Sequence, residues 1–349
     1  MRNLLFLVPM LLVSVILLAG CAQSQPTSAP KPTLQPNAVL SAKTDSAPVL
    51  DGQPEALWDK ASSITIPIAG GANSGSHEAT LKSVYSGDSV YFLVQWTDPT
   101  ESLYRMPWQK QADGSWKHLT TSATHQENTN YEDKLAFIWN IDNSISGFNE
   151  QGCMVTCHVG ETPANSGFGS KYTANPGEIG DIWHWKAVRT NPVGQSDDQY
   201  VDSMRYDKEK ASGAGRHADP KDGGGYKNNL TEDKTLPAFG IKDNKPAPTY
   251  WILDSEKESF SDASYKAGDE VPGIVVSPIT GDRGDISAKG VYKDGKWTVE
   301  LGRKLSTGSQ YDVQYADLTK SYFFGVAVFD NAQVDHSWSN GAYELRFAK

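Results

Sequence analysis

Residues 79–96 read ATLKSVY-SGDS-VYFLVQW, two runs rich in β-branched and aromatic residues on either side of a glycine-containing turn. Apolar and polar side chains partly alternate in each run, as they do in a strand that buries one face. The turn Ser86-Gly87-Asp88 is short enough to bring the second run back against the first. This stretch therefore predicts an antiparallel hairpin.

Further strands are predicted on both sides of this hairpin. Residues 63–68 alternate cleanly, and residues 134–141 are apolar enough for a buried central strand. Asp294-Gly295 separates two alternating runs, which is a strong hairpin signal. The remaining predicted strands are residues 285–292, 297–301, 322–329 and 341–347. Many short strands between turn signals predict an all-β fold, a single β-sandwich.

The segment between about residues 142 and 285 interrupts this pattern. It is rich in Gly, Asn, Asp and Pro, although residues 181–187 keep a strand-like character. Long irregular loops inside a compact domain are usually functional or disordered. We interpret this segment as loop insertions around a ligand and not as a second domain.

The N-terminus has the features of an export signal. Arg2 precedes an apolar run from Leu4 to Leu18, which is short for a membrane span. The run ends in Leu18-Ala19-Gly20-Cys21, which resembles the lipobox at which bacterial lipoproteins are cleaved and then acylated on the cysteine. Residues 1–20 are therefore predicted to be a signal peptide and Cys21 a lipidation site, which would tether the protein to a membrane outside the cytoplasm.

Residues 21–48 are dominated by Ser, Thr, Pro, Gln and Ala. A stretch with so few bulky apolar residues buries too little surface to fold, so it is predicted to be a flexible tether. The folded domain is then predicted to be residues 49–349. The formal net charge of −10 argues against nucleic acid as a partner.

The chemistry of the chain is indicated most sharply by Cys153-Met154-Val155-Thr156-Cys157-His158. Covalent attachment of haem requires two thiols for the two vinyl groups and a histidine directly after the second thiol. The usual spacing is C-x-x-C-H, and here one extra residue separates the cysteines. The motif predicts one c-type haem, with Cys153 and Cys157 as thioether ligands and His158 as an axial ligand of the iron.

Other readings of this motif stay open. The two cysteines could form a disulfide in an exported protein that holds haem b or no cofactor. They could also bind another metal together with His158, although three ligands from one short loop leave a coordination position to fill.

A low-spin haem needs a second axial ligand, and His336 is the first candidate. It follows the apolar strand that ends at Phe329, and therefore lies at one end of the sandwich. His184 is the second candidate. It stands between Trp183 and Trp185, so strand alternation places its ring on the opposite face from both indoles.

The order of these pieces along the chain resembles a family of haem-binding proteins. Leu50-Asp51-Gly52, residues 91–98, residues 182–187 and the strands after Asp285 carry the resemblance. The family includes the gamma subunits of ethylbenzene dehydrogenase and dimethylsulfide dehydrogenase. The opening pieces are shared with a wider group of sandwich domains, of the DOMON and CBM9 kind, that bind haem or sugar.

The resemblance implies a β-sandwich with one haem near one end. In the gamma subunits the haem is b-type and is ligated by a Met and a Lys. In this sequence His158 falls near the region of that Met, and His336 falls near the place of that Lys, which is the main reason for ranking His336 first. The chain is thus expected to be a haem c branch of the family.

Three functions compete at this point. The first is an exported, membrane-anchored mono-haem cytochrome that passes electrons between redox proteins. The second is a haem b relay subunit of an exported molybdenum oxidoreductase. The third is a haem-free sandwich that binds sugar through its tryptophans. The chain has neither a dinucleotide-binding glycine fingerprint nor a phosphate loop, so an electron carrier is favoured over a catalytic chain.

Overall fold

The computed structural model describes residues 36–120, 127–156, 171–246 and 250–349. The predicted hairpin is present: β3 (Ser76–Ser86) and β4 (Ser89–Thr97) pair antiparallel, from Ala79 opposite Trp96 to Ser86 opposite Ser89. The second predicted hairpin joins β17 (Ser287–Lys293) to β18 (Lys296–Lys304). Its turn residues Asp294 and Gly295 have φ values of 52° and 74°, the left-handed conformation that a tight two-residue hairpin turn requires.

These hairpins belong to a sheet that has thirteen strands in the described residues. Its path runs β10-β9-β8-β7-β19-β20-β2-β3-β4-β18-β17, and β1 and β21 pair beside this path. The remaining strands of this sheet are β1 (Ala38–Lys43), β2 (Ile64–Ala69), β7 (Lys134–Asn140), β8 (Gly180–Lys186), β9 (Asp197–Val201), β10 (Arg216–Ala218), β19 (Tyr322–Phe329), β20 (Ser337–Ser339) and β21 (Tyr343–Phe347).

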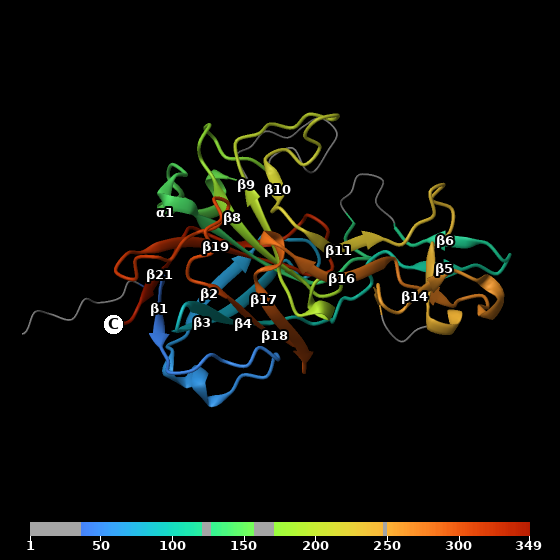
Figure 1. Cartoon of the computed structure of the whole chain (residues 1–349), viewed down its shortest axis with the longest axis horizontal. Coiled ribbons are helices and arrows are strands. Elements are labelled where there is room, and N and C mark those ends of the chain that lie inside the picture. The colour runs from blue at the N-terminus through green and yellow to red at the C-terminus, as the bar shows by residue number, and fades with distance from the viewer. Residues whose placement is uncertain (1–35, 121–126, 157–170, 247–249) are drawn as a thin grey trace, which may run out of the picture. The chain divides into compact units, whose positions relative to one another are not determined.

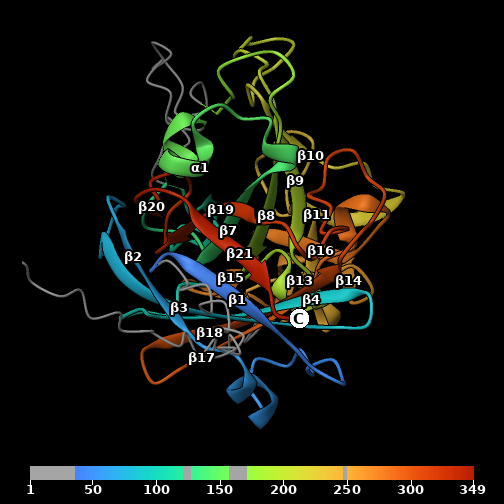
Figure 2. The same ribbon diagram turned by 90° about the vertical axis from the view of Figure 1, so that its left-hand side faces the viewer.

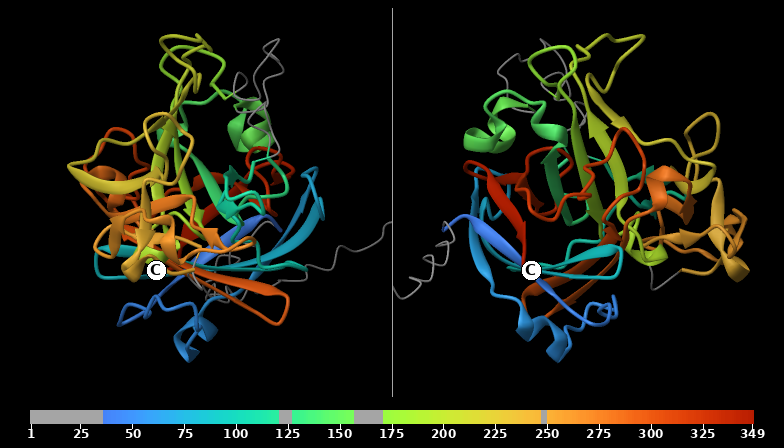
Figure 3. Two further views of the ribbon diagram at one scale, coloured as in Figure 1. Left: turned by 90° about the vertical axis from the view of Figure 1, so that its right-hand side faces the viewer. Right: turned by 60° about the vertical axis from the view of Figure 1, so that its left-hand side comes forward.

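The two halves of this sheet face each other across one apolar core, which makes the fold a β-sandwich (Figure 1 and Figure 3). Phe92 on β4 lies 5.7 Å from Phe137 on β7 and 5.6 Å from Trp183 on β8, between ring centroids. Tryptophans fill much of the remaining space, with Trp96 and Trp297 stacked at 6.2 Å. The predicted all-β class and sandwich architecture are therefore confirmed.

The first and last strands of the domain lie side by side, as Figure 2 shows for β1 and β21. β1 pairs in parallel with β21 and also in parallel with β3, so it links the two halves of the sheet. Val39 on β1 is fully buried. This corrects the predicted boundary of the tether at residue 48, because residues 38–43 are a strand of the folded domain.

The segment between residues 142 and 285 is more regular than predicted. β8, β9 and β10 extend the main sheet, and three minor sheets lie together on one side of it (Figure 1 and Figure 3). The minor strands are β5 (Trp108–Lys110), β6 (Trp116–His118), β11 (Gly223–Asn228), β12 (Phe239–Ile241), β13 (Ile252–Leu253), β14 (Lys257–Ser259), β15 (Glu270–Val271) and β16 (Ile274–Thr280).

Helices in the described residues are short. The α-helix α1 (Phe148–Gln151) runs directly into the 3-10 helix η3 (Gly152–Val155). The other 3-10 helices are η1 (Ala56–Lys60), η2 (Ile141–Asn143), η4 (Asn191–Val193), η5 (Lys242–Asn244), η6 (Asp262–Ser264) and η7 (Asp282–Gly284). Within the described part of the chain, no helix has the length and apolarity needed to cross a bilayer.

Candidate functional site

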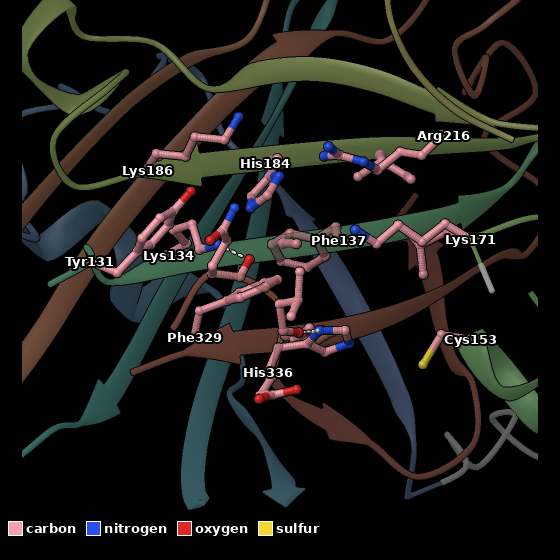
Figure 4. Close-up of a pocket in the computed structure, with 18 of the residues that line it drawn as sticks. Tyr131, Lys134, Phe137, Cys153, Lys171, His184, Lys186, Arg216, Phe329 and His336 are labelled. Carbon is pink, nitrogen blue, oxygen red and sulfur yellow. Dashed lines mark hydrogen bonds between the residues drawn. The ribbon is translucent and has the colours of Figure 1, made fainter. Parts of the chain in front are cut away.

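A pocket with a volume of about 420 Å³ opens on the outer face of β19, β7 and β8 (Figure 4). These three strands are neighbours in the sheet, and their register places outward-facing residues in three rows. The charged row is Phe329, Lys134 and Lys186; the middle row is Ala327, Ala136 and His184; the apolar row is Gly325, Ile138 and Ile182.

The rows explain why there is a hollow at this position. Two alanines and a glycine lie among larger residues, so the sheet surface is low between its charged and apolar ends. The charged and apolar rows are four residues apart along each strand, or about 13 Å. Three walls enclose the floor: the β9–β10 region with Arg216, Tyr226 from β11, and the loop that carries His336.

His184 stands in the middle row and points into the pocket, whereas Trp183 and Trp185 face the core, as strand alternation predicts. Its Nδ1 lies 3.5 Å from Oε1 of Gln199, and its buried Nε2 has no hydrogen-bond partner among the described residues. Burial, reinforced by the charges of Lys186 and Lys134, holds the pKa of His184 well below its ordinary value. The imidazole is therefore neutral, with a lone pair available.

His336 enters the pocket from the loop between β19 and β20. Its Nδ1 lies 2.8 Å from the carbonyl oxygen of Val334, to which it donates a hydrogen bond. This bond fixes the tautomer in which Nε2 carries the lone pair, the arrangement typical of a metal-ligating histidine. His336 and His184 both contact Phe329, with ring centroids 4.7 and 5.3 Å from it.

Cys153 lies in η3 at the apolar end of the pocket. It packs with Ile138 and Ile182 in a small apolar cluster, and its Cβ would lie 3.7 Å from a Cβ added to Gly325. The cysteine loop therefore lies within van der Waals reach of β19 at Gly325. The predicted partners Cys157 and His158, and the predicted lipidation site Cys21, lie outside the described residues.

Cations dominate the opposite end of the pocket. Lys134 is almost fully buried, and its ammonium donates to the carbonyl of Gln333 at 2.9 Å while lying 3.8 Å above the ring of Phe329. Lys186 is equally buried and is paired with Asp197. Arg105 and Arg189 line this end too, whereas Lys171 and Arg216 line the pocket on the side of Cys153.

These cations were not predicted as site residues. One signal was available for Lys134, since a lysine inside a predicted buried strand needs a partner or a role. Strand alternation also places Lys134 on the same face as Ala136 and Ile138. Nothing local identifies Arg105 or Arg216, because they reach the pocket from segments far apart in the sequence.

The pocket fits the haem that the motif predicts. It has an end that carries one of the two predicted thioether cysteines, two imidazole side chains as possible iron ligands, and an end with basic side chains for carboxylates. Nε2 of His184 is buried and has no hydrogen-bond partner among the described residues. Because buried polar atoms are nearly always hydrogen-bonded, this nitrogen is the clearest indication of a bound ligand. With haem bound, Cys153 and Cys157 would form the thioether bonds, and His158 and one of His336 and His184 would be the iron ligands.

The fold and the pocket together define a class: a β-sandwich with a pocket, basic at one end, on the outer face of its sheet. The chain belongs to the ethylbenzene dehydrogenase family, because the model of that family, described as "Ethylbenzene dehydrogenase", matches residues 55–341. The match confirms the family resemblance drawn from the sequence. No curated protein matches the chain.

Two of the solved structures to which the chain is similar are described as carbohydrate-binding proteins. A family 9 carbohydrate-binding module from Caldicellulosiruptor kristjanssonii, in complex with glucose, is 9% identical, with a TM-score of 0.33 over 88% of this chain and 94% of that chain. A putative carbohydrate-binding protein from Bacteroides uniformis is 8% identical, with a TM-score of 0.31 over 89% of this chain and 100% of that chain. At these identities the likeness concerns the fold alone.

Proposed function

We propose that this chain is an extracytoplasmic electron-transfer protein that carries one haem in the pocket on β19, β7 and β8. The observation that carries the proposal is the convergence of Cys153, His184 and His336. They come from three distant parts of the sequence, each was selected from the sequence for haem binding, and all line one pocket. Membership of a family named after an oxidoreductase supports a redox role.

Haem supplies one-electron chemistry at iron, and the protein's task is to hold it, exclude water and set its potential. We assign thioether attachment to Cys153 and Cys157, whose S–H bonds add across the two vinyl groups. His158 would be one ligand of the iron, and His336 or His184 would be the other. The buried cations at the far end oppose a further positive charge on the iron, so they favour the ferrous state.

The cofactor is tested by a denaturing gel stained for haem peroxidase activity. The wild type and Cys153→Ser/Cys157→Ser are expressed together with a cytochrome c maturation system. We expect a stained band in the wild type and none in the double variant. A red native protein whose stain is lost on denaturation would replace haem c by haem b, and a colourless protein despite competent maturation would refute the haem function.

We further propose that the protein works with other redox proteins. Its net charge of −10 suits a partner with a basic docking face, and such an encounter weakens as salt is added. Family membership favours one kind of partner, the catalytic subunit of a molybdenum oxidoreductase. Pull-down of a molybdenum-containing chain from the native host, in low salt, would support this partner. Recovery of c-type cytochromes alone would point to a free-standing carrier.

The site of action is proposed to be the outer side of a membrane, where acylated Cys21 anchors the chain. We expect the wild type to partition into membranes on fractionation, and Cys21→Ser to be recovered in the soluble fraction. Equal partition of both forms would refute the lipid anchor and would leave the haem proposal intact.

A further inference from the structure

Three cations surround one aromatic ring at the charged end of the pocket. The guanidinium carbon of Arg105 lies 4.7 Å from the ring centroid of Tyr131, and the ammonium of Lys134 lies 4.9 Å from it. The guanidinium carbon of Arg189 lies 5.5 Å away. All three side chains are at least nine-tenths buried, so their charges are only weakly screened by water.

One carboxylate serves these three cations. Glu132 is fully buried and forms ion pairs with Arg189 and, at 3.9 Å, with Nε of Arg105. Next to them, Asp197 is the buried partner of both Lys186 and Arg283. Five basic side chains thus lie around two carboxylates, and burial lowers the pKa of Lys134 and of Lys186, which disfavours their charged forms. A surplus of buried positive charge is costly unless an anion is present.

Arg105 shows where that anion would bind. Its Nη2 makes one long hydrogen bond, 3.4 Å to Oδ1 of Asn228. Its Nε and Nη1 are buried and have no hydrogen-bond partner among the described residues. A guanidinium presents its N–H groups as a planar fork that matches the two oxygens of a carboxylate. Arg105 therefore offers unused donors inside a net-positive pocket.

The other end of the pocket carries Cys153 in a small apolar cluster, far from Tyr131 in Figure 4, and Lys171 and Arg216 line the pocket on that same side. Haem has one apolar edge and one charged edge. Its two vinyl groups, which react with cysteines, are on one edge, and its two propionates are on the opposite edge. We propose that Arg105, Lys134 and Arg189 form a carboxylate subsite that binds the haem propionates and so allows only one orientation of the haem. This inference rests on the proposed haem function. It additionally assigns the propionate edge of the haem to these three residues.

The test compares two ligands that differ only in the carboxylates. Full-length protein prepared without haem is titrated with ferric protoporphyrin IX and, separately, with its dimethyl ester, and the Soret band reports binding. Losing a charge-assisted hydrogen bond costs on the order of 10-fold in affinity. We expect the wild type to bind the ester at least about 10-fold more weakly than the free acid.

Arg105→Met removes one of the three charges while keeping much of the side-chain volume, and we expect its preference for the acid over the ester to be several-fold smaller than that of the wild type. Arg205→Met is the matched control, because Arg205 is exposed and does not line the pocket. It should keep the wild-type preference for the acid. Should Arg105→Met fail to fold, the comparison of acid and ester on the wild type still decides the question.

A second arm separates this inference from the haem function. Inorganic phosphate is added to the haem-free protein, and the melting temperature is followed. Phosphate could raise the melting temperature of the wild type but not of Arg105→Met, while the protein binds neither porphyrin. This result would support the anion subsite and assign it to a free oxoanion. It would also refute the haem function. Equal binding of acid and ester by the wild type would overturn the propionate subsite and leave the haem function standing.

Discussion

The imidazole of His336 is the better placed of the two axial candidates at the level of single residues. Its Nδ1 donates to a backbone carbonyl at 2.8 Å, whereas Nδ1 of His184 lies 3.5 Å from its partner, at the limit of a hydrogen bond. We expect His336→Ala to change the ferric haem from low-spin to high-spin, and His184→Ala to remain low-spin. Visible absorption spectra of the two purified variants measure this, and the reverse pattern would assign the ligand to His184.

Asp98 offers a separate prediction about pH. It lies after β4 against Asp133 and Asp330, and among the described residues no lysine or arginine forms an ion pair with these three carboxyl groups. Burial, together with the charge of Asp330, raises the pKa of Asp98 from 3.8 to about 6. The folded state therefore binds more protons than the unfolded state between these values, and stability falls as the pH rises from 3.8 through about 6.

Asp98→Asn removes this titration while keeping the oxygen that accepts a hydrogen bond from the backbone N–H of Thr100. We expect the variant to be more stable than the wild type at pH 7, by on the order of 1 to 2 kcal/mol, and similar to it at pH 4. Urea denaturation at both pH values is the measurement. The exposed Asp45→Asn should change neither value. A destabilised Asp98→Asn at pH 7 would show that the carboxylate is needed in its charged form.

At the level of secondary structure, the small residues on the pocket floor are the feature to test. Ala136 lies on β7 in the middle row, between Ala327 and His184. Ala136→Leu fills the centre of the hollow, so we expect haem content per protein to fall several-fold while the free energy of unfolding changes by less than about 1.5 kcal/mol. Pyridine haemochrome analysis and urea denaturation measure the two quantities.

Ala69→Leu is a matched control for this substitution, because Ala69 is an exposed alanine on β2. It should leave haem content at the wild-type level. Wild-type haem content in Ala136→Leu would mean that haem, if bound, does not occupy this floor.

The sequence predicts a strand or hairpin well when neighbouring residues are enough to form it, and poorly when distant strands are needed. The β3–β4 and β17–β18 hairpins are predictable, because Gly87 and Asp294-Gly295 act on their immediate neighbours. The short strands β9 and β10 are not predictable, since their residues are polar and they form only by pairing with the strands beside them, β9 with β8 and β10 with β9.

For the site, the sequence predicts the cysteine-histidine motif and the direction in which the His184 side chain points. It does not predict the cationic end, because Arg105, Lys134 and Arg189 meet only in three dimensions.

At the scale of the whole molecule, substitutions in β1 test where the folded domain begins along the sequence. Val39 on β1 is fully buried, whereas Val49, at the predicted boundary, is 64% exposed. We expect Val39→Ala to destabilise the protein by about 2 kcal/mol through lost burial and a residual cavity, and Val49→Ala to have no measurable effect. Thermal and urea unfolding of the two variants give the comparison. Equal stabilities would mean that β1 contributes little to the domain.

The pairing of β1 with β21 also has a consequence for the order of events during folding. Ala38 is opposite Glu344, so one of the earliest strands to leave the ribosome must wait for one of the last. Such a contact has almost the largest sequence separation that the chain allows, and contacts of this kind slow folding. Until β21 arrives, the β1 residues that pair with it, Ala38 to Ser41, have an unpaired edge that can recruit a neighbouring chain. A chaperone that shields the N-terminal half during synthesis or transport would meet this need.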